Sequence, residues 1–124
     1  MAILVVATPS LAGNAPSAAG CDAARSLLDR GELDKARDAY LDVLAADSSS
    51  RCAPRGLRAV TRGKRQEERL CAEGAVLAKA DQREEAERRY VAALKENVAS
   101  DCAKEGLAAK KSKGFWHHVG DGIA

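Results

Sequence analysis

Aromatic side chains and strand-forming runs are scarce in this chain. Only 3% of its 124 residues are aromatic, namely two tyrosines, one phenylalanine and one tryptophan. The single β-branched run, Ile3-Leu4-Val5-Val6, stands at the N-terminus. Alanine and leucine supply most of the 46% hydrophobic content, and 31% of residues are charged. This composition favours helices, and the length suits one modest domain, so the sequence predicts an all-α protein.

The groups that catalysis or nucleic-acid binding would need are also few. The two histidines, His117 and His118, are adjacent, so their side chains point apart on a regular element and make a poor ligand pair. Neither a phosphate-binding glycine loop nor a nucleophile beside a base is present. The net charge of +2 is spread over interleaved acids and bases rather than gathered in a basic patch. We therefore expect no enzyme activity, no cofactor or metal, and no nucleic-acid partner.

The acidic residues of the second half lie beside arginines and lysines at helical spacing. That pattern predicts solvated faces with salt bridges rather than a pair of catalytic carboxylates. The residues concerned are Glu67, Glu68, Glu84, Glu85 and Glu87.

What the chain does contain is an internal repeat. Residues 21–60 and 71–110 align without a gap at an offset of 50. A repeat is typical of a stacked array rather than of an enzyme built around a unique site. The matched positions include Cys21 with Cys71, Leu27 with Leu77, Ala36 with Ala86, Tyr40 with Tyr90, Leu44 with Leu94, Cys52 with Cys102, Gly56 with Gly106 and Leu57 with Leu107.

Apolar residues three and four positions apart predict three helices in each copy, about six in all. In the first copy they cover about 21–30, 34–46 and 53–60, and Gly31 ends the first of them. In the second copy they cover about 65–79, 83–94 and 100–110. Gly63 is expected to break or kink the chain between the copies. The alternative is one long helix through residues 60–71. Gly63 disfavours it, because a glycine inside a helix destabilises the helix by about 1 kcal/mol relative to alanine.

The stretch 31–47 resembles the second half of a tetratricopeptide repeat (TPR). Gly31 takes the place of the turn glycine, Ala36 that of the small packing residue, and Tyr40 that of the aromatic four positions later. The small residue lets two helices approach closely and the aromatic fills the space between them, so we expect both tyrosines in the core. The first helices lack the family's Trp, and the period of 50 exceeds the usual ~34 by about one helix. The second copy matches at Ala86, Tyr90, Ala93 and Leu94.

The resemblance implies a small right-handed stack of two TPR-like units within residues 21–113. It also implies a non-catalytic scaffold that binds a protein or peptide partner, since relatives hold peptides in the groove between the first helices of successive hairpins. With so few repeats the groove is short, so affinity would depend on Trp116 or on self-association as a homo-oligomer. The alternative functions are an intracellular adaptor with reduced cysteines and a thiol-redox protein.

All four cysteines belong to the repeat, and their intervals are equal. Cys21 precedes Cys52 by 31 positions, as Cys71 precedes Cys102, which indicates the same disulfide twice and an oxidising compartment. In a TPR-like stack the first and third helices run parallel, which would bring these cysteines within bonding distance. A Cys52–Cys71 bond, four buried thiols and a metal or redox site are the alternatives, although the close pairs typical of structural zinc ligands are missing.

Both ends of the chain differ from the repeat. Residues 1–20 combine a short apolar stretch with small residues, which indicates a truncated secretory signal or a disordered tail. Cys21 follows a segment that resembles a lipidation box, but its match with Cys71 favours a structural role. No run is long enough to span a bilayer.

In the tail, 114–124, the candidate interaction residues Phe115 and Trp116 follow a lysine cluster. The alternatives are a cap on the last helix and a disordered segment. If the natural chain continues beyond Ala124, a bilayer anchor is one candidate for the next segment. Taken with the cysteines, these features lead us to expect an extracytoplasmic bacterial protein, secreted or membrane-anchored.

Overall fold

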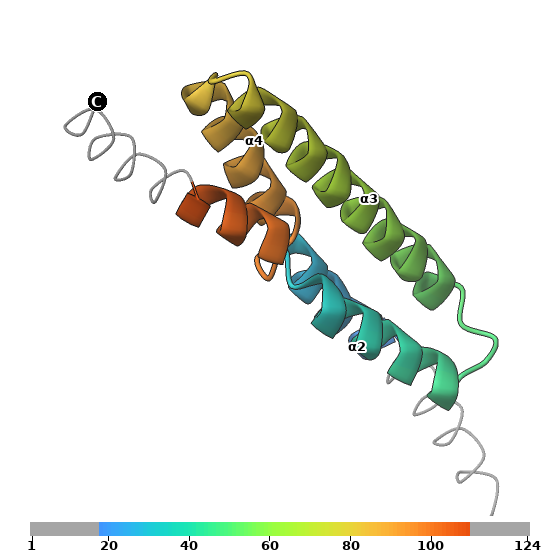
Figure 1. The fold of residues 1–124 in the computed structure, drawn as a ribbon. Coiled ribbons are helices and arrows are strands. Elements are labelled where there is room, and N and C mark those ends of the chain that lie inside the picture. Colours follow the sequence, from blue (N-terminus) through green and yellow to red (C-terminus); the bar gives the residue numbers. More distant parts are fainter. Residues whose placement is uncertain (1–17, 110–124) are drawn as a thin grey trace, which may run out of the picture. The chain divides into compact units, whose positions relative to one another are not determined.

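A computed structural model describes residues 18–109, and within them every regular element is a helix (Figure 1). Residues 18–29 form the first helix, followed by α2 (Leu33–Ala46), α3 (Cys52–Lys79) and α4 (Arg83–Glu96). Residues 101–109 form the last helix. The predicted all-α class is confirmed.

The expectation of a break at Gly63 is wrong, so the described part of the chain has five helices instead of six. Helix α3 runs uninterrupted for 28 residues, and Gly63 is buried inside it. One internal glycine costs a helix only about 1 kcal/mol, which the packing of a helix this long outweighs. The long-helix alternative is therefore the correct one.

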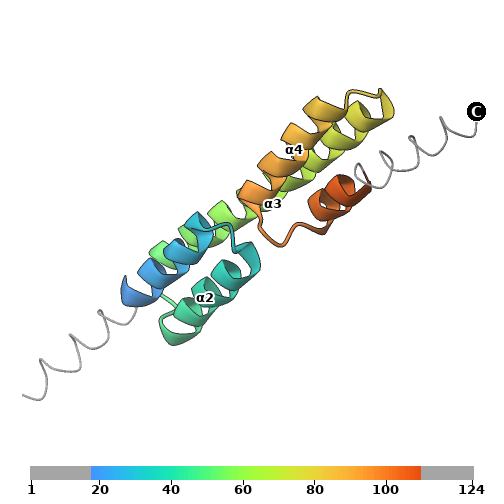
Figure 2. The same cartoon turned by 90° about the vertical axis from the view of Figure 1, so that its left-hand side faces the viewer.

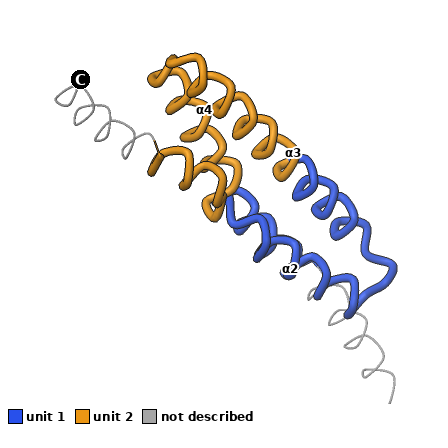
Figure 3. Tube along the Cα trace, viewed as in Figure 1, with its two compact units in different colours: residues 1–62 blue, residues 63–124 orange. Residues whose placement is uncertain are grey.

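Two compact units divide the chain, one ending at Arg62 and the other beginning at Gly63 (Figure 3). The first unit holds residues 18–29, α2 and the start of α3, and the second holds the rest of α3, α4 and residues 101–109. In each unit the middle helix runs back beside the segment that precedes it (Figure 2). The sequence repeat thus corresponds to a three-helix arrangement that is built twice.

The first turn of each unit places one residue in the left-handed region. Gly31 has a φ of 77°, and Asp81 at the matched position has a φ of 64°. Glycine reaches this region freely, and aspartate is one of the few other residues that tolerate it. Two backbone hydrogen bonds at matched positions close each turn, and their N–H groups donate to carbonyls three and five residues earlier. The bonds are Gly31 to Leu28 and Glu32 to Leu27 in the first unit, and Asp81 to Ala78 and Gln82 to Leu77 in the second.

The second connection of each unit also has the same design. An Asx side chain accepts the N–H two residues on, and a serine hydroxyl then accepts the N–H of the third residue after it, which caps the next helix. The bonds are Ser49 N–H to Asp47 (3.0 Å), Ala99 N–H to Asn97 (3.1 Å), Ala53 N–H to Ser50 (3.3 Å) and Ala103 N–H to Ser100 (3.3 Å).

A tyrosine forms the centre of each core, as the sequence predicted. Tyr40 is 4% exposed and Tyr90 is 7% exposed. A Cβ added to Gly56 would lie 2.1 Å from the Tyr40 ring, and one added to Gly106 would lie 2.4 Å from the Tyr90 ring. The matched glycines therefore let each ring rest against the backbone of the third helical segment.

Candidate functional site

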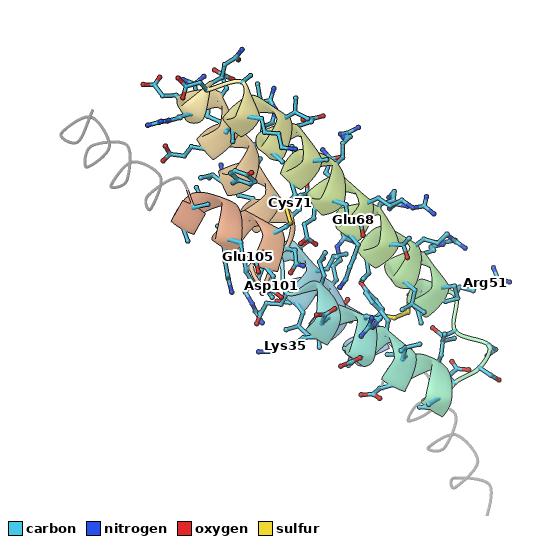
Figure 4. All side chains as sticks on the ribbon, viewed as in Figure 1. Lys35, Arg51, Glu68, Cys71, Asp101 and Glu105 are labelled. Atoms are coloured by element: carbon cyan, nitrogen blue, oxygen red, sulfur yellow. A yellow bond between two sulfur atoms is a disulfide. The ribbon has the colours of Figure 1, made fainter. Side chains whose placement is uncertain are left out.

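The disulfides are those that the equal spacing predicted. Cys21 bonds Cys52 with a Cα–Cα separation of 6.3 Å, and Cys71 bonds Cys102 with a separation of 6.1 Å. All four cysteines are paired, so neither the Cys52–Cys71 alternative nor the free-thiol alternative holds. Both bonds appear in yellow in Figure 4, that of Cys71 labelled. Each one ties the first helical segment of a unit to the third.

In the first unit, a groove of about 420 Å³ lies along this pair of tied segments. Its floor includes Tyr40, Gly56 and the disulfide of Cys21 and Cys52. One wall belongs to residues 18–29 and the other to the start of α3. The charged side chains that line it are Asp22, Arg25 and Asp29 on the first wall, and Arg55 and Arg62 on the second.

Three exposed arginines dominate the charge of this groove. Arg25, Arg55 and Arg62 form no ion pair within the part of the chain that the structure describes. Burial raises the pKa of the Tyr40 hydroxyl, an effect that Arg25 opposes and Asp29 reinforces. A guanidinium stays charged at any working pH and presents donors that match a carboxylate in a bidentate fashion. The groove can therefore hold a chain segment that carries carboxylates.

The second unit does not repeat these charges. The positions that match Asp22, Arg25 and Arg55 are Ala72, Ala75 and Glu105. Glu105 is exposed (Figure 4). The residues common to both copies make the scaffold and the floor of the groove, whereas those that differ supply its charges. A comparison of the two copies position by position was the sequence signal that could have found it.

In the second unit, a buried carboxylate lies beside the disulfide. Glu67 is 9% exposed, its Oε1 accepts the Asn97 side-chain amide at 2.8 Å, and its Oε2 lies 3.8 Å from Sγ of Cys102. The prediction of a solvated Glu67 is therefore wrong. Its position four residues before Cys71 places both on one face of α3, which was the available signal. Its neighbour Glu68 is exposed, as predicted.

Other predicted groups lie beyond the described part of the chain. The candidate interaction residues Phe115 and Trp116, and the paired histidines His117 and His118, belong to residues 110–124. Residues 1–17 of the signal-like segment are outside it as well. Within residues 18–109, no group of three or more metal-ligating side chains comes together.

None of the helices between residues 18 and 109 combines the length and the apolar content that crossing a bilayer requires. Comparison of the chain with protein-family models, with curated proteins and with solved structures finds no match. Any function of the chain must therefore be argued from its own geometry and charge.

Proposed function

We propose that this protein is a non-catalytic, TPR-like scaffold that binds a carboxylate-bearing segment of a protein or peptide partner in the groove of its first unit. The observation that carries the proposal is the trio Arg25, Arg55 and Arg62 around an open groove, with no ion pair among the described residues to neutralise them. In the proposed architecture the two units stack in a right-handed manner, as the resemblance implies.

The form of the groove supports this proposal. Its volume of about 420 Å³ falls within the range of about 300–1,000 Å³ that is usual for ligand sites. The disulfide of Cys21 and Cys52 ties its two walls, so little ordering is needed on binding. Tyr40 and Gly56 offer an apolar floor, while the arginines supply orientation and charge.

The cross-links also support an extracytoplasmic location, secreted or membrane-anchored. Disulfides persist in oxidising compartments and are rare where thiols are kept reduced. The two bonds in this chain are compatible with such a compartment. A self-associated form, in which a second copy lengthens the short groove, belongs to the same proposal.

Peptide arrays with graded acidic content, probed with the intact oxidised protein, test this function. We expect retention to rise with the number of Asp and Glu residues and to fall in high salt, because the Debye length shrinks from about 10 Å at 0.1 M to about 3 Å at 1 M. The variant R25A/R55A/R62A should lose this retention. The control K79A/K95A/K104A removes the same charge from exposed positions of the second unit and should keep it. Equal retention by both variants would refute the proposed site.

A further inference from the structure

The second unit contains an apolar hollow of about 80 Å³. Tyr90, Ala86 and Gly106 line it together with Ala78 and Ala109, and the charged residues Arg83 and Glu87 complete the lining. Its volume is several times the roughly 10–15 Å³ that one buried water requires, yet an apolar wall gives water few partners. It is therefore a place for a hydrophobic side chain.

The first unit has larger aliphatic side chains at two of the matched positions. Leu28 stands where the second unit has Ala78, and Leu33, only 2% exposed, stands where it has Arg83. After Ala59, the match of Ala109, the first unit continues with Val60, which is 3% exposed and belongs to the core. At these two positions the second unit has alanine and arginine in place of leucine, and both residues border the hollow. Among the described residues of the second unit, no aliphatic side chain larger than that of alanine lines the hollow.

The missing side chain is available a few residues along the chain. The sequence continues from Ala109 through a lysine cluster to Phe115 and Trp116, its only phenylalanine and its only tryptophan. Trp116 is the seventh residue after Ala109, and a fully extended chain of that length spans at most about 25 Å. Since Ala109 itself lines the hollow, Trp116 lies within reach of it.

The chemistry of the hollow suits this segment. The Tyr90 ring offers an aromatic partner, and the Arg83 guanidinium can stack on an indole. Glu87 has the charge opposite to that of the preceding lysines. We propose that the hollow is the docking site of the Phe115–Trp116 segment of the same chain, with the Trp116 indole against Tyr90. The second unit then completes its core with its own C-terminal residues. This docking is independent of the arginine groove of the first unit.

Because the chain has a single tryptophan, its fluorescence reports on Trp116 alone. In the full chain we expect a blue-shifted emission maximum and weak quenching by acrylamide. The variant A78L restores the leucine of the first unit, fills the hollow, and should shift the emission to the red and increase the quenching. The control A75L adds the same side chain at an exposed position one turn earlier on α3 and should behave as the wild type.

A measurement without any substitution accompanies these variants. Nuclear Overhauser contacts between the Trp116 indole and the Tyr90 ring are expected in the wild-type protein. The proposal fails if Trp116 is quenched in the native protein as freely as in urea. It fails equally if the tryptophan is protected but unaffected by A78L and without contacts to Tyr90. Protection that is lost on dilution would assign the ring to a second copy and would overturn docking within one chain.

Discussion

The contact between each core tyrosine and a helix glycine gives a graded prediction. An added Cβ would lie 2.1 Å from the Tyr40 ring at Gly56, 2.4 Å from the Tyr90 ring at Gly106 and 2.8 Å from the Tyr90 ring at Gly74. Distances below about 3 Å require the ring to move, and both rings are held in buried sites. We therefore expect the free energy of unfolding to be lowered most by Gly56→Ala, less by Gly106→Ala and least by Gly74→Ala.

The magnitude is set by two opposing effects. Replacement of a helix glycine by alanine stabilises a helix by about 1 kcal/mol when nothing else changes. Overpacking a close-packed core costs about 1–3 kcal/mol, so Gly56→Ala, with the shortest of these distances, should lower the free energy of unfolding by up to about 2 kcal/mol. Gly74→Ala should be near neutral, because the first unit already has Ala24 at the matched position, fully buried.

Urea unfolding followed by circular dichroism measures this series. The matched control is the double variant G56A/Y40L, in which a smaller side chain faces the new methyl group. If the reasoning holds, G56A costs less in the Tyr40→Leu background than in the wild type. A G56A protein that gains the full helix-propensity benefit with Tyr40 in place would refute the assignment of Gly56 as a packing contact.

Four further predictions concern the disulfides, the buried carboxylate and the core tyrosine. The variant C21A/C52A removes a cross-link between positions 31 residues apart, so the chain-entropy treatment predicts that its free energy of unfolding is about 3.5–4 kcal/mol lower than that of the wild type. Reductant should destabilise this variant less than it destabilises the wild type. Alkylation of the native protein without reductant should label no cysteine by mass spectrometry, whereas labelling of all four would support an intracellular adaptor. Glu67→Ala should lower the free energy of unfolding by about 1–3 kcal/mol, because it leaves the buried Asn97 amide without its acceptor. The control Glu68→Ala, at the adjacent exposed position, should change it by less than about 0.5 kcal/mol. Equal effects of the two substitutions would contradict the buried contact. Burial raises the pKa of Tyr40 above 10.0, so the folded state favours the protonated hydroxyl. The free energy of unfolding should therefore be unaffected by Tyr40 below pH 10.0 and should fall as the pH rises further. Tyr40→Phe should reduce that fall, and an alkaline stability profile identical to that of the wild type would exclude Tyr40 as its source.

The prediction for Gly63 failed because local propensity is a weak signal. A glycine penalty of about 1 kcal/mol is easily outweighed when the residues on both sides gain buried contacts. The prediction for Glu67 failed because a helical charge pattern shows which residues share a face but not what covers that face. Asn97, thirty positions away, covers it here.

The sequence by itself determined the all-helical class and the duplication, and its equal spacing indicated the pairing of the cysteines, which the structure then decided. These properties follow from the helical spacing of apolar residues and from residues that recur at an offset of 50, and both signals can be read along the chain. The tertiary structure alone decided that Arg25 and Arg55 face one groove, that Glu67 is buried and that Ala78 borders a hollow. The physical reason is that each depends on side chains brought together from separate helices, and their distances are set by packing rather than by position along the chain.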